Sequence, residues 1–295
     1  MTRLPLMLLA RKIALRHCAA LLLALACVPP AAGQATVAAM VTDLQGKATI
    51  TLAGRSMPAT ILSEITVGAQ IQLPADAALV LLYLDSGAEY GIKGPALVVA
   101  RQTQPESLSG APPVRRASVL GPAIRVKPAG LGQAAIVMRS LAVNHRIQLL
   151  AASNTLVLDR QPELRWQAPQ PGLRYQVEIA DDTGRILHEA QVDGTSLPVP
   201  ASLQLSDGQA YTWAVSARLP DGRRYASSGN FSVASAELRA QANGLAAAAG
   251  TDVPSRVTYG VWLDQSGLKD EARALWRVLA AERPEDERLR ALALR

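Results

Sequence analysis

The sequence contains little cysteine, histidine or phenylalanine. Its 295 residues include 2 cysteines, 3 histidines and 1 phenylalanine. Both cysteines, Cys18 and Cys27, lie near the N-terminus, so the chain beyond them has no thiol for a disulfide, a thiolate metal site or a nucleophile. Only two histidines follow, His145 and His188, which are too few and too far apart for a metal site or a Ser–His pair. The sequence therefore predicts no catalytic residue, no cofactor and no metal.

An excess of positive charge is also nearly absent once the N-terminus is set aside. The chain has 30 basic and 24 acidic residues. Four of the basic residues, Arg3, Arg11, Lys12 and Arg16, lie in the first segment, which has no acid, so 26 of the 30 remain against 24. The rest of the chain is close to neutral, and the pI of about 9.6 gives no support for nucleic-acid binding.

Long hydrophobic runs are missing as well. The apolar stretch Cys18–Val28 follows a basic segment and ends at Pro29-Pro30, so it is shorter than the roughly 20 residues of a membrane span. Small residues follow it, from Ala31 to Ala35. This three-part plan predicts a secretory signal peptide over residues 1–35, cleavage near Gly33 or Ala35, and export to a periplasm.

A lipid anchor is the alternative for the same segment. Ala24-Leu25-Ala26-Cys27 is similar to a lipoprotein processing box, in which Cys27 would be acylated. Ala24 stands where such a box normally has leucine, so we favour plain cleavage. Membrane association is expected only if Cys27 is lipidated or the leader is not cleaved.

Residues 36–150 are patterned as short strands and turns, with a core over residues 40–100. Leu79–Leu84 is an almost unbroken apolar run, which indicates a strand buried on both faces, and Asp85-Ser86-Gly87 then turns the chain. The polar, proline-containing stretch 101–118 is predicted to be a mobile loop. Strand patterning returns over 119–150, most clearly at Ala134–Met138 and Arg146–Leu150. We assign it to this first β domain.

The glycines and strands of this region resemble the FecR-like domain family. The matching features are Gly46, Gly68-Ala69-Gln70-Ile71, the Leu79–Leu84 strand and the Asp85-Ser86-Gly87 turn, where Ser86 is inserted into the family's Asp-Gly pair. The resemblance implies a compact periplasmic β-roll. FecR itself is a signal-transducing regulator with a cytoplasmic segment. This sequence has no room for such a segment, so the signalling role is not expected to come with the domain.

Residues 154–234 are predicted to form a second β unit, a sandwich. Tyr175, Val177 and Ile179 alternate with polar residues, and Asp-Gly or Thr-Gly turns recur along the segment. The unit resembles a fibronectin type III or related Ig-like domain. Trp166, the Tyr175 strand, and Leu205 six residues before Tyr211, as in a tyrosine corner, carry the likeness, although Asp207 stands where the family has proline. Trp166 and Trp213 are predicted core residues; exposed binding residues are the alternative.

Residues 235–295 change to helical patterning. Helices are predicted over Ala236–Ala249, over Arg256–Gln265, after Gly267, and from Pro284 onward. The spacing resembles one tetratricopeptide repeat, and its matching residues are Gly260, Gly267, Ala272, Trp276 and Pro284. A lone repeat must cover its apolar face, and we favour packing within the chain over a groove for a partner.

Other candidate motifs have simpler explanations. Ser266 and Lys269 match the Ser-x-x-Lys of penicillin-recognising enzymes, but the companion motifs are absent. Asp181-Asp182-Thr183-Gly184 is predicted to be a hairpin turn rather than a calcium loop. His188 is expected on a solvent-facing strand. Arg115-Arg116 could contact an anionic partner, but a solvated surface pair is favoured.

The sequence as a whole predicts a mainly β protein: a FecR-like β-roll, an Ig/fibronectin III-like β-sandwich and a small C-terminal α-helical segment. The expected function is non-enzymatic, as an interaction or scaffold module that binds a protein or cell-wall glycan in the envelope, with no nucleic-acid partner. The alternative is a periplasmic sensor or regulator of a membrane signalling partner. An uncharacterised hydrolase is a third hypothesis. Alanine at His145, His188 or Ser266 should leave either of the first two functions intact.

Overall fold

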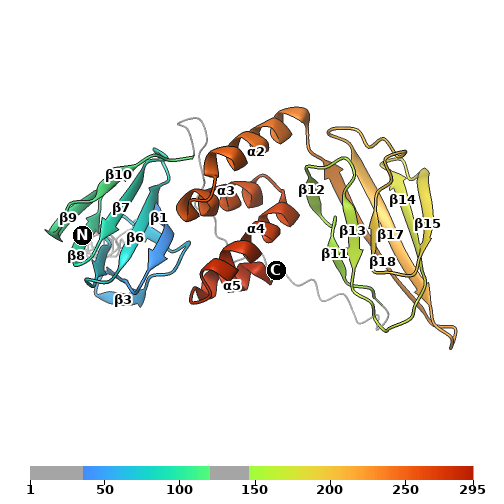
Figure 1. Ribbon diagram of the computed structural model, residues 1–295, viewed down its shortest axis with the longest axis horizontal. Coiled ribbons are helices and arrows are strands. Elements are labelled where there is room, and N and C mark those ends of the chain that lie inside the picture. Colours follow the sequence, from blue (N-terminus) through green and yellow to red (C-terminus); the bar gives the residue numbers. More distant parts are fainter. Residues whose placement is uncertain (1–35, 120–145, 295) are drawn as a thin grey trace, which may run out of the picture. The chain divides into compact units, whose positions relative to one another are not determined.

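Antiparallel sheets dominate the computed structural model, which describes residues 36–119 and 146–294, and helices occupy the end of the chain (Figure 1). The predicted fold class is confirmed: the protein is mainly β and sandwich-like, with a small C-terminal helical segment.

Two five-stranded sheets form the first β unit. One has the order β10-β7-β6-β1-β4 and the other β3-β2-β5-β8-β9. The strands of the first sheet are β1 (Val37–Gln45), β4 (Glu64–Thr66), β6 (Ala78–Tyr83), β7 (Glu89–Lys93) and β10 (Val114–Arg116). Those of the second are β2 (Thr49–Leu52), β3 (Arg55–Pro58), β5 (Gln70–Leu73), β8 (Ala96–Ala100) and β9 (Pro105–Gly110). Alternating apolar residues such as Ile71, Leu79, Leu81 and Val98 are buried between them.

The strand β6 is buried on both faces, as its unbroken apolar run predicts. Leu79, Leu81 and Tyr83 belong to the core between the two sheets. Leu82 and the following Leu84 point the other way and belong to a core shared with the helices. The period of two along the strand therefore supplies two different cores from one segment.

The prediction of a loop over 101–118 is wrong. The segment contains β9, which pairs with β8, and β10, which pairs with β7. Each is the outermost strand of its sheet, and all three residues of β10 are exposed. Edge strands are held by backbone hydrogen bonds on one side and need no apolar alternation, so polar composition does not exclude them. Pro105 is the first residue of β9, a position that proline tolerates.

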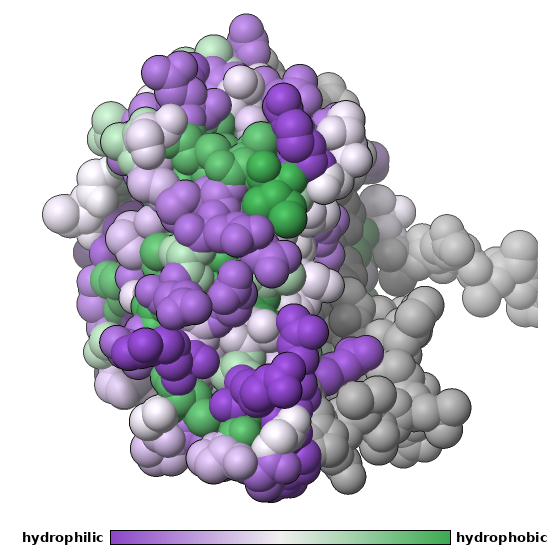
Figure 2. All heavy atoms as spheres, turned by 90° about the vertical axis from the view of Figure 1, so that its right-hand side faces the viewer, coloured by the Kyte–Doolittle hydropathy of each residue, from purple (hydrophilic) through white to green (hydrophobic). Residues whose placement is uncertain are grey.

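The second β unit is a sandwich of a five-stranded sheet, order β12-β18-β17-β14-β15, and a three-stranded sheet, order β11-β13-β16. The larger sheet contains β12 (Thr155–Val157), β14 (Tyr175–Asp181), β15 (Ile186–Val192), β17 (Ala210–Arg218) and β18 (Arg224–Val233). The smaller contains β11 (Leu149–Ala151), β13 (Glu163–Trp166) and β16 (Ser196–Pro198). On the side of β14 and β15 most of the surface is hydrophilic, with separate small hydrophobic areas (Figure 2).

The core of the sandwich is aromatic. Trp166 and Trp213 are each 1% exposed, which confirms the prediction that they are core residues. The hydroxyl of Tyr211 accepts a hydrogen bond of 2.8 Å from the backbone N–H of Ser206, as in a tyrosine corner.

The assignment of 146–150 to the first β unit is wrong, because β11 pairs with β13 in the sandwich. Alternation predicts a strand but not its partner, which explains the error. The predicted strand at Ala134–Met138 lies outside the described residues.

Four helices follow in the described chain: α2 (Ala236–Ala249), α3 (Val253–Gln265), α4 (Lys269–Glu282) and α5 (Glu287–Ala293). The first has the predicted bounds. The next begins before the predicted Arg256 because Asp252 caps it and Pro254 fits its first turn. The last begins after the predicted Pro284 because Asp286 is its N-cap.

The helices cover one face of the first β unit. Val257, Val261 and Trp262 share a core with Met40 and Leu82. The Asp286 carboxylate also accepts a 2.8 Å hydrogen bond from the backbone N–H of Ile61, a bond that is buried. The helical segment therefore packs within the chain.

Candidate functional site

The described residues that were weighed for catalysis and set aside, His188, Ser266 and Lys269, lie on different elements. His188 is half-buried on the edge strand β15, and His145 lies outside the described residues. Ser266 ends α3, whereas the Nζ of Lys269 donates to the carbonyl oxygen of Asn154 at 2.9 Å. Lys269 thus joins α4 to the sandwich. In residues 36–119 and 146–294, no group of three or more His, Cys, Asp or Glu side chains is arranged to hold a metal ion.

The Asp181 turn has the predicted hairpin geometry. Its Oδ1 accepts hydrogen bonds from the backbone N–H of Thr183 and of Arg185 and from the hydroxyl of Thr183. These local donors occupy the carboxylate that a calcium loop would need.

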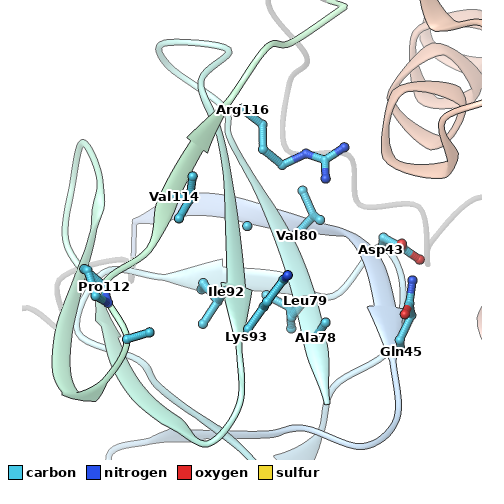
Figure 3. Close-up of a pocket in the computed structure, with 12 residues that line it drawn as sticks. Asp43, Gln45, Ala78, Leu79, Val80, Ile92, Lys93, Pro112, Val114 and Arg116 are labelled. Atoms are coloured by element: carbon cyan, nitrogen blue, oxygen red, sulfur yellow. The ribbon is translucent and has the colours of Figure 1, made fainter. Parts of the chain in front are cut away.

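A groove on the outer face of the β10-β7-β6-β1 sheet is the candidate site (Figure 3). It has a volume of about 450 Å³, in the range of ligand-binding pockets. Period-two alternation brings one pair of residues from each strand to this face: Asp43 and Gln45, Ala78 and Val80, Gly91 and Lys93, Val114 and Arg116. Ala111 and Pro112, between β9 and β10, close one side.

The floor of the groove is apolar and low. Ala78 presents only a methyl group and Gly91 no side chain, Val80 is short and apolar, and Val114 is 66% exposed beside them. A Cβ on Gly91 would lie 3.4 Å from Cδ of Arg116, so the arginine stem crosses the strand where the glycine leaves room. A small apolar floor beside an exposed valine can take an apolar side chain.

The charges around the groove are unequal. Asp43 is buried, and its Oδ1 accepts hydrogen bonds from its neighbour's backbone N–H at 3.0 Å and from Nε of Arg283 at 3.3 Å. Arg116 forms an ion pair of 2.8 Å with Asp252, the N-cap of α3. Lys93 is exposed and has no ion pair within the described residues. The rim therefore keeps one uncompensated positive charge.

A buried carboxyl lies on the same sheet, two residues before Gly91. Glu89 is 0% exposed, and neither of its oxygens has a hydrogen-bond partner in the described part of the chain. Burial raises its pKa to about 7, whereas the positive charge of Arg116 opposes the shift and the negative charge of Asp252 adds to it. The carboxyl thus lies where the first β unit meets α3.

The sequence does not reveal this groove. The Arg115-Arg116 pair is predicted to be solvated, whereas in the structure Arg116 forms the ion pair with Asp252 and lines the groove. The alternation of Val114 and Arg116 is the one sequence pattern that indicates a strand at this edge of the groove. No sequence pattern indicates Lys93, because its position on the groove face of the sheet follows from the register of β7 against β6 and β10.

Comparisons with known proteins add no family. No family model matches the chain, and no curated protein matches it. Among solved structures, CopC from Methylosinus trichosporium OB3b is 21% identical over 30% of this chain and 95% of CopC, with a TM-score of 0.23. A cytokine receptor complex is 14% identical over 65% of this chain and 86% of that chain, with a TM-score of 0.23. Likenesses this weak carry no argument.

No helix of the described residues has the length and hydrophobicity needed to cross a membrane.

Proposed function

We propose that this protein is a non-enzymatic, exported module of the cell envelope whose FecR-like β-roll binds a protein partner. The groove on the outer sheet face carries the proposal. It offers an apolar floor, an exposed valine and one lysine without an ion pair among the described residues. His188, Ser266 and Lys269, which were weighed for catalysis, do not line it. Such a surface recognises shape and charge.

The occupant is an extended peptide segment of the partner with an apolar side chain next to an aspartate or glutamate. The apolar side chain fits over Val80 and Ala78, where little protein side chain projects. The carboxylate reaches Lys93, the rim charge that no described acid compensates. A basic peptide would meet this lysine unfavourably, because Asp43 is already neutralised by Arg283.

Selection from a random peptide library tests the proposal with a defined probe. The parent protein should enrich peptides that pair an apolar residue with Asp or Glu, and the Lys93→Glu variant should enrich basic residues instead. Lys47→Glu is the matched control, because Lys47 is exposed on the same unit but does not line the groove. An unchanged charge preference in Lys93→Glu would refute the assignment of Lys93.

A second pair of variants tests the apolar contact. Val114→Glu should weaken binding of the selected peptides about tenfold or more, since it places a charge beside the apolar floor, where the peptide's apolar side chain would bury it. Leu108→Glu should not, although Leu108 is also exposed (47%), because it lies on β9 outside the groove. Equal effects of the two substitutions would place the peptide elsewhere.

The sensor alternative has one feature in its favour. Arg116 lines the groove and pairs with Asp252 at the start of α3, so an occupant of the groove touches a residue bonded to the helices. Under this alternative the selected peptide changes hydrogen exchange in α3, and Arg116→Gln removes that change while the peptide still binds. Unaltered exchange in α3 would favour the simple binding module.

A further inference from the structure

A second surface lies on the sandwich, where arginines face one another across neighbouring strands. Arg218 at the end of β17 is the direct partner of Arg224 at the start of β18. Directly opposed residues in an antiparallel pair have Cβ atoms about 5 Å apart, and like charges there are destabilising. Further along the same face the two strands pair neutral residues, such as Ser216 with Ala226 and Ala214 with Ser228.

Carboxylates do not compensate this pair. Among the described residues, neither Arg218 nor Arg224 has an ion-pair partner, although Nη2 of Arg224 donates to the Ser216 hydroxyl at 3.2 Å. The adjacent Arg223 differs, because it is paired with Asp221 at 2.6 Å. The two opposed guanidinium groups thus remain available to an anion, and guanidinium groups bind carboxylates and phosphates in a bidentate manner.

The residues around Arg218 and Arg224 indicate which class of anionic ligand this surface could bind. The two arginines line a hollow of about 510 Å³ together with Arg174, Gln176, Gln191 and Ser216. Arg174, just before β14, is itself paired with Asp193 at 2.7 Å. The amide and hydroxyl groups can each donate and accept hydrogen bonds, as sugar hydroxyls require.

An acidic row lies beyond the amides on the same face. Glu178 of β14, which also lines the hollow, is the direct partner of Glu189 of β15. Two residues along a strand span about 7 Å. The surface therefore changes from cationic to neutral polar over about 7 Å, and from cationic to anionic over about 14 Å. A uniformly anionic polymer such as nucleic acid would be repelled at the glutamate row. A sugar with one acidic group and several hydroxyls suits all three rows.

We propose that this face, centred on Arg218 and Arg224, binds acidic polysaccharide, with a sugar carboxylate on the arginines and sugar hydroxyls on Gln176, Gln191 and Ser216. The hollow is lined mostly by charged and amide side chains, which suits a hydrophilic glycan chain. The site is separate from the groove on the β-roll and does not depend on it.

Calorimetric titration of the full chain with an oligosaccharide that carries one uronic acid among neutral sugars tests the proposal, with the methyl ester of the same oligosaccharide as a neutral probe. The acid form should bind, and the ester should bind at least about tenfold more weakly, because the ester has lost the charge that the guanidinium groups recognise. The affinity for the acid should fall as salt is raised. Absence of binding, or equal binding of the ester, would overturn the proposal.

Charge-matched variants distinguish a site from general attraction. Arg218→Gln with Arg224→Gln should lower the affinity at least tenfold. Arg185→Gln with Arg223→Gln removes the same charge from exposed hairpin arginines that have carboxylate partners, and should change it less than twofold. Equal losses in the two double variants would overturn the assignment. Lys93→Glu should leave glycan binding unchanged, so this proposal and that for the groove fail independently.

Discussion

The buried carboxyl of Glu89 makes the stability of this protein depend on pH in a calculable way. Burial raises its pKa from 4.5 to about 7 in the folded chain. Between these values the folded state holds a proton that the unfolded state releases, so folding is favoured by acid. The contribution is fully present below about pH 4.5 and is lost as the pH rises through 7. The gap between the two pKa values corresponds to about 3 kcal/mol.

Glu89→Gln removes this dependence and keeps the size of the side chain. The amide stays neutral at every pH, so the variant and the parent should have similar free energies of unfolding at pH 5. At pH 8 the variant should be more stable by up to about 3 kcal/mol, because the parent must then bury a charge or bind a proton. Urea unfolding followed by tryptophan fluorescence, between pH 5 and pH 8.5, measures the difference.

The comparison needs a carboxyl that is not buried. Glu64→Gln serves, since Glu64 is exposed on β4 of the same unit, and its curve should run parallel to that of the parent. Glu89→Gln should instead diverge from the parent above about pH 6. If the parent and Glu89→Gln stay parallel across the range, Glu89 is solvated or paired in solution and the calculation is wrong.

Four further substitutions test packing and hydrogen-bonding contacts by thermal or urea unfolding. Gly260→Ala should cost about 1–3 kcal/mol, because its Cβ would lie 2.5 Å from an indole carbon of the next helix; Gly244→Ala, with open space around it in α2, should stabilise by about 0.5–1 kcal/mol. Tyr211→Phe should cost about 1 kcal/mol by removing the hydroxyl that accepts a backbone N–H. Asp207→Asn should lower the melting temperature most at neutral pH, because hydrogen bonds from two arginines hold the Asp207 pKa well below its usual range. The loss should shrink below about pH 4, where the unfolded parent binds a proton at Asp207 that the folded parent does not, so that acid destabilises the parent.

The sequence predicts those parts of the fold that depend on neighbours along the chain. Tyr175, Val177 and Ile179 alternate, and they form the buried face of β14. The Leu79–Leu84 run predicts a doubly buried strand, and the two cores on either side of β6 confirm it. The alanine-rich segment gives α2 with its bounds because Ser235 caps it and Gly250 ends it.

The candidate sites depend on neighbours far along the chain, and the sequence does not give those. Glu89 follows a turn and looks like a surface residue, yet it is buried, and one of the charges that acts on it, Asp252, lies more than 150 residues later. The strand β10 has no apolar pattern because only its backbone pairs with β7. Arg218 and Arg224 are separated by one hairpin, and nothing but the register makes them direct partners.

The two proposed surfaces share one electrostatic property, a cation that has no ion-pair partner among the described residues. Most arginines of the described chain pair with a carboxylate close by: Arg160 and Arg239 share Asp207, and Arg283 joins Asp43. Such pairing limits unspecific attraction to anions, as expected for a chain whose charges nearly balance beyond its N-terminus. Cations without partners stand out against this background when they also border a hollow. Lys93 borders a hollow with an apolar floor, whereas Arg218 and Arg224 border a hollow lined by amide and hydroxyl groups. The neutral residues around each cation, rather than its charge, therefore distinguish a site for a peptide from a site for a sugar.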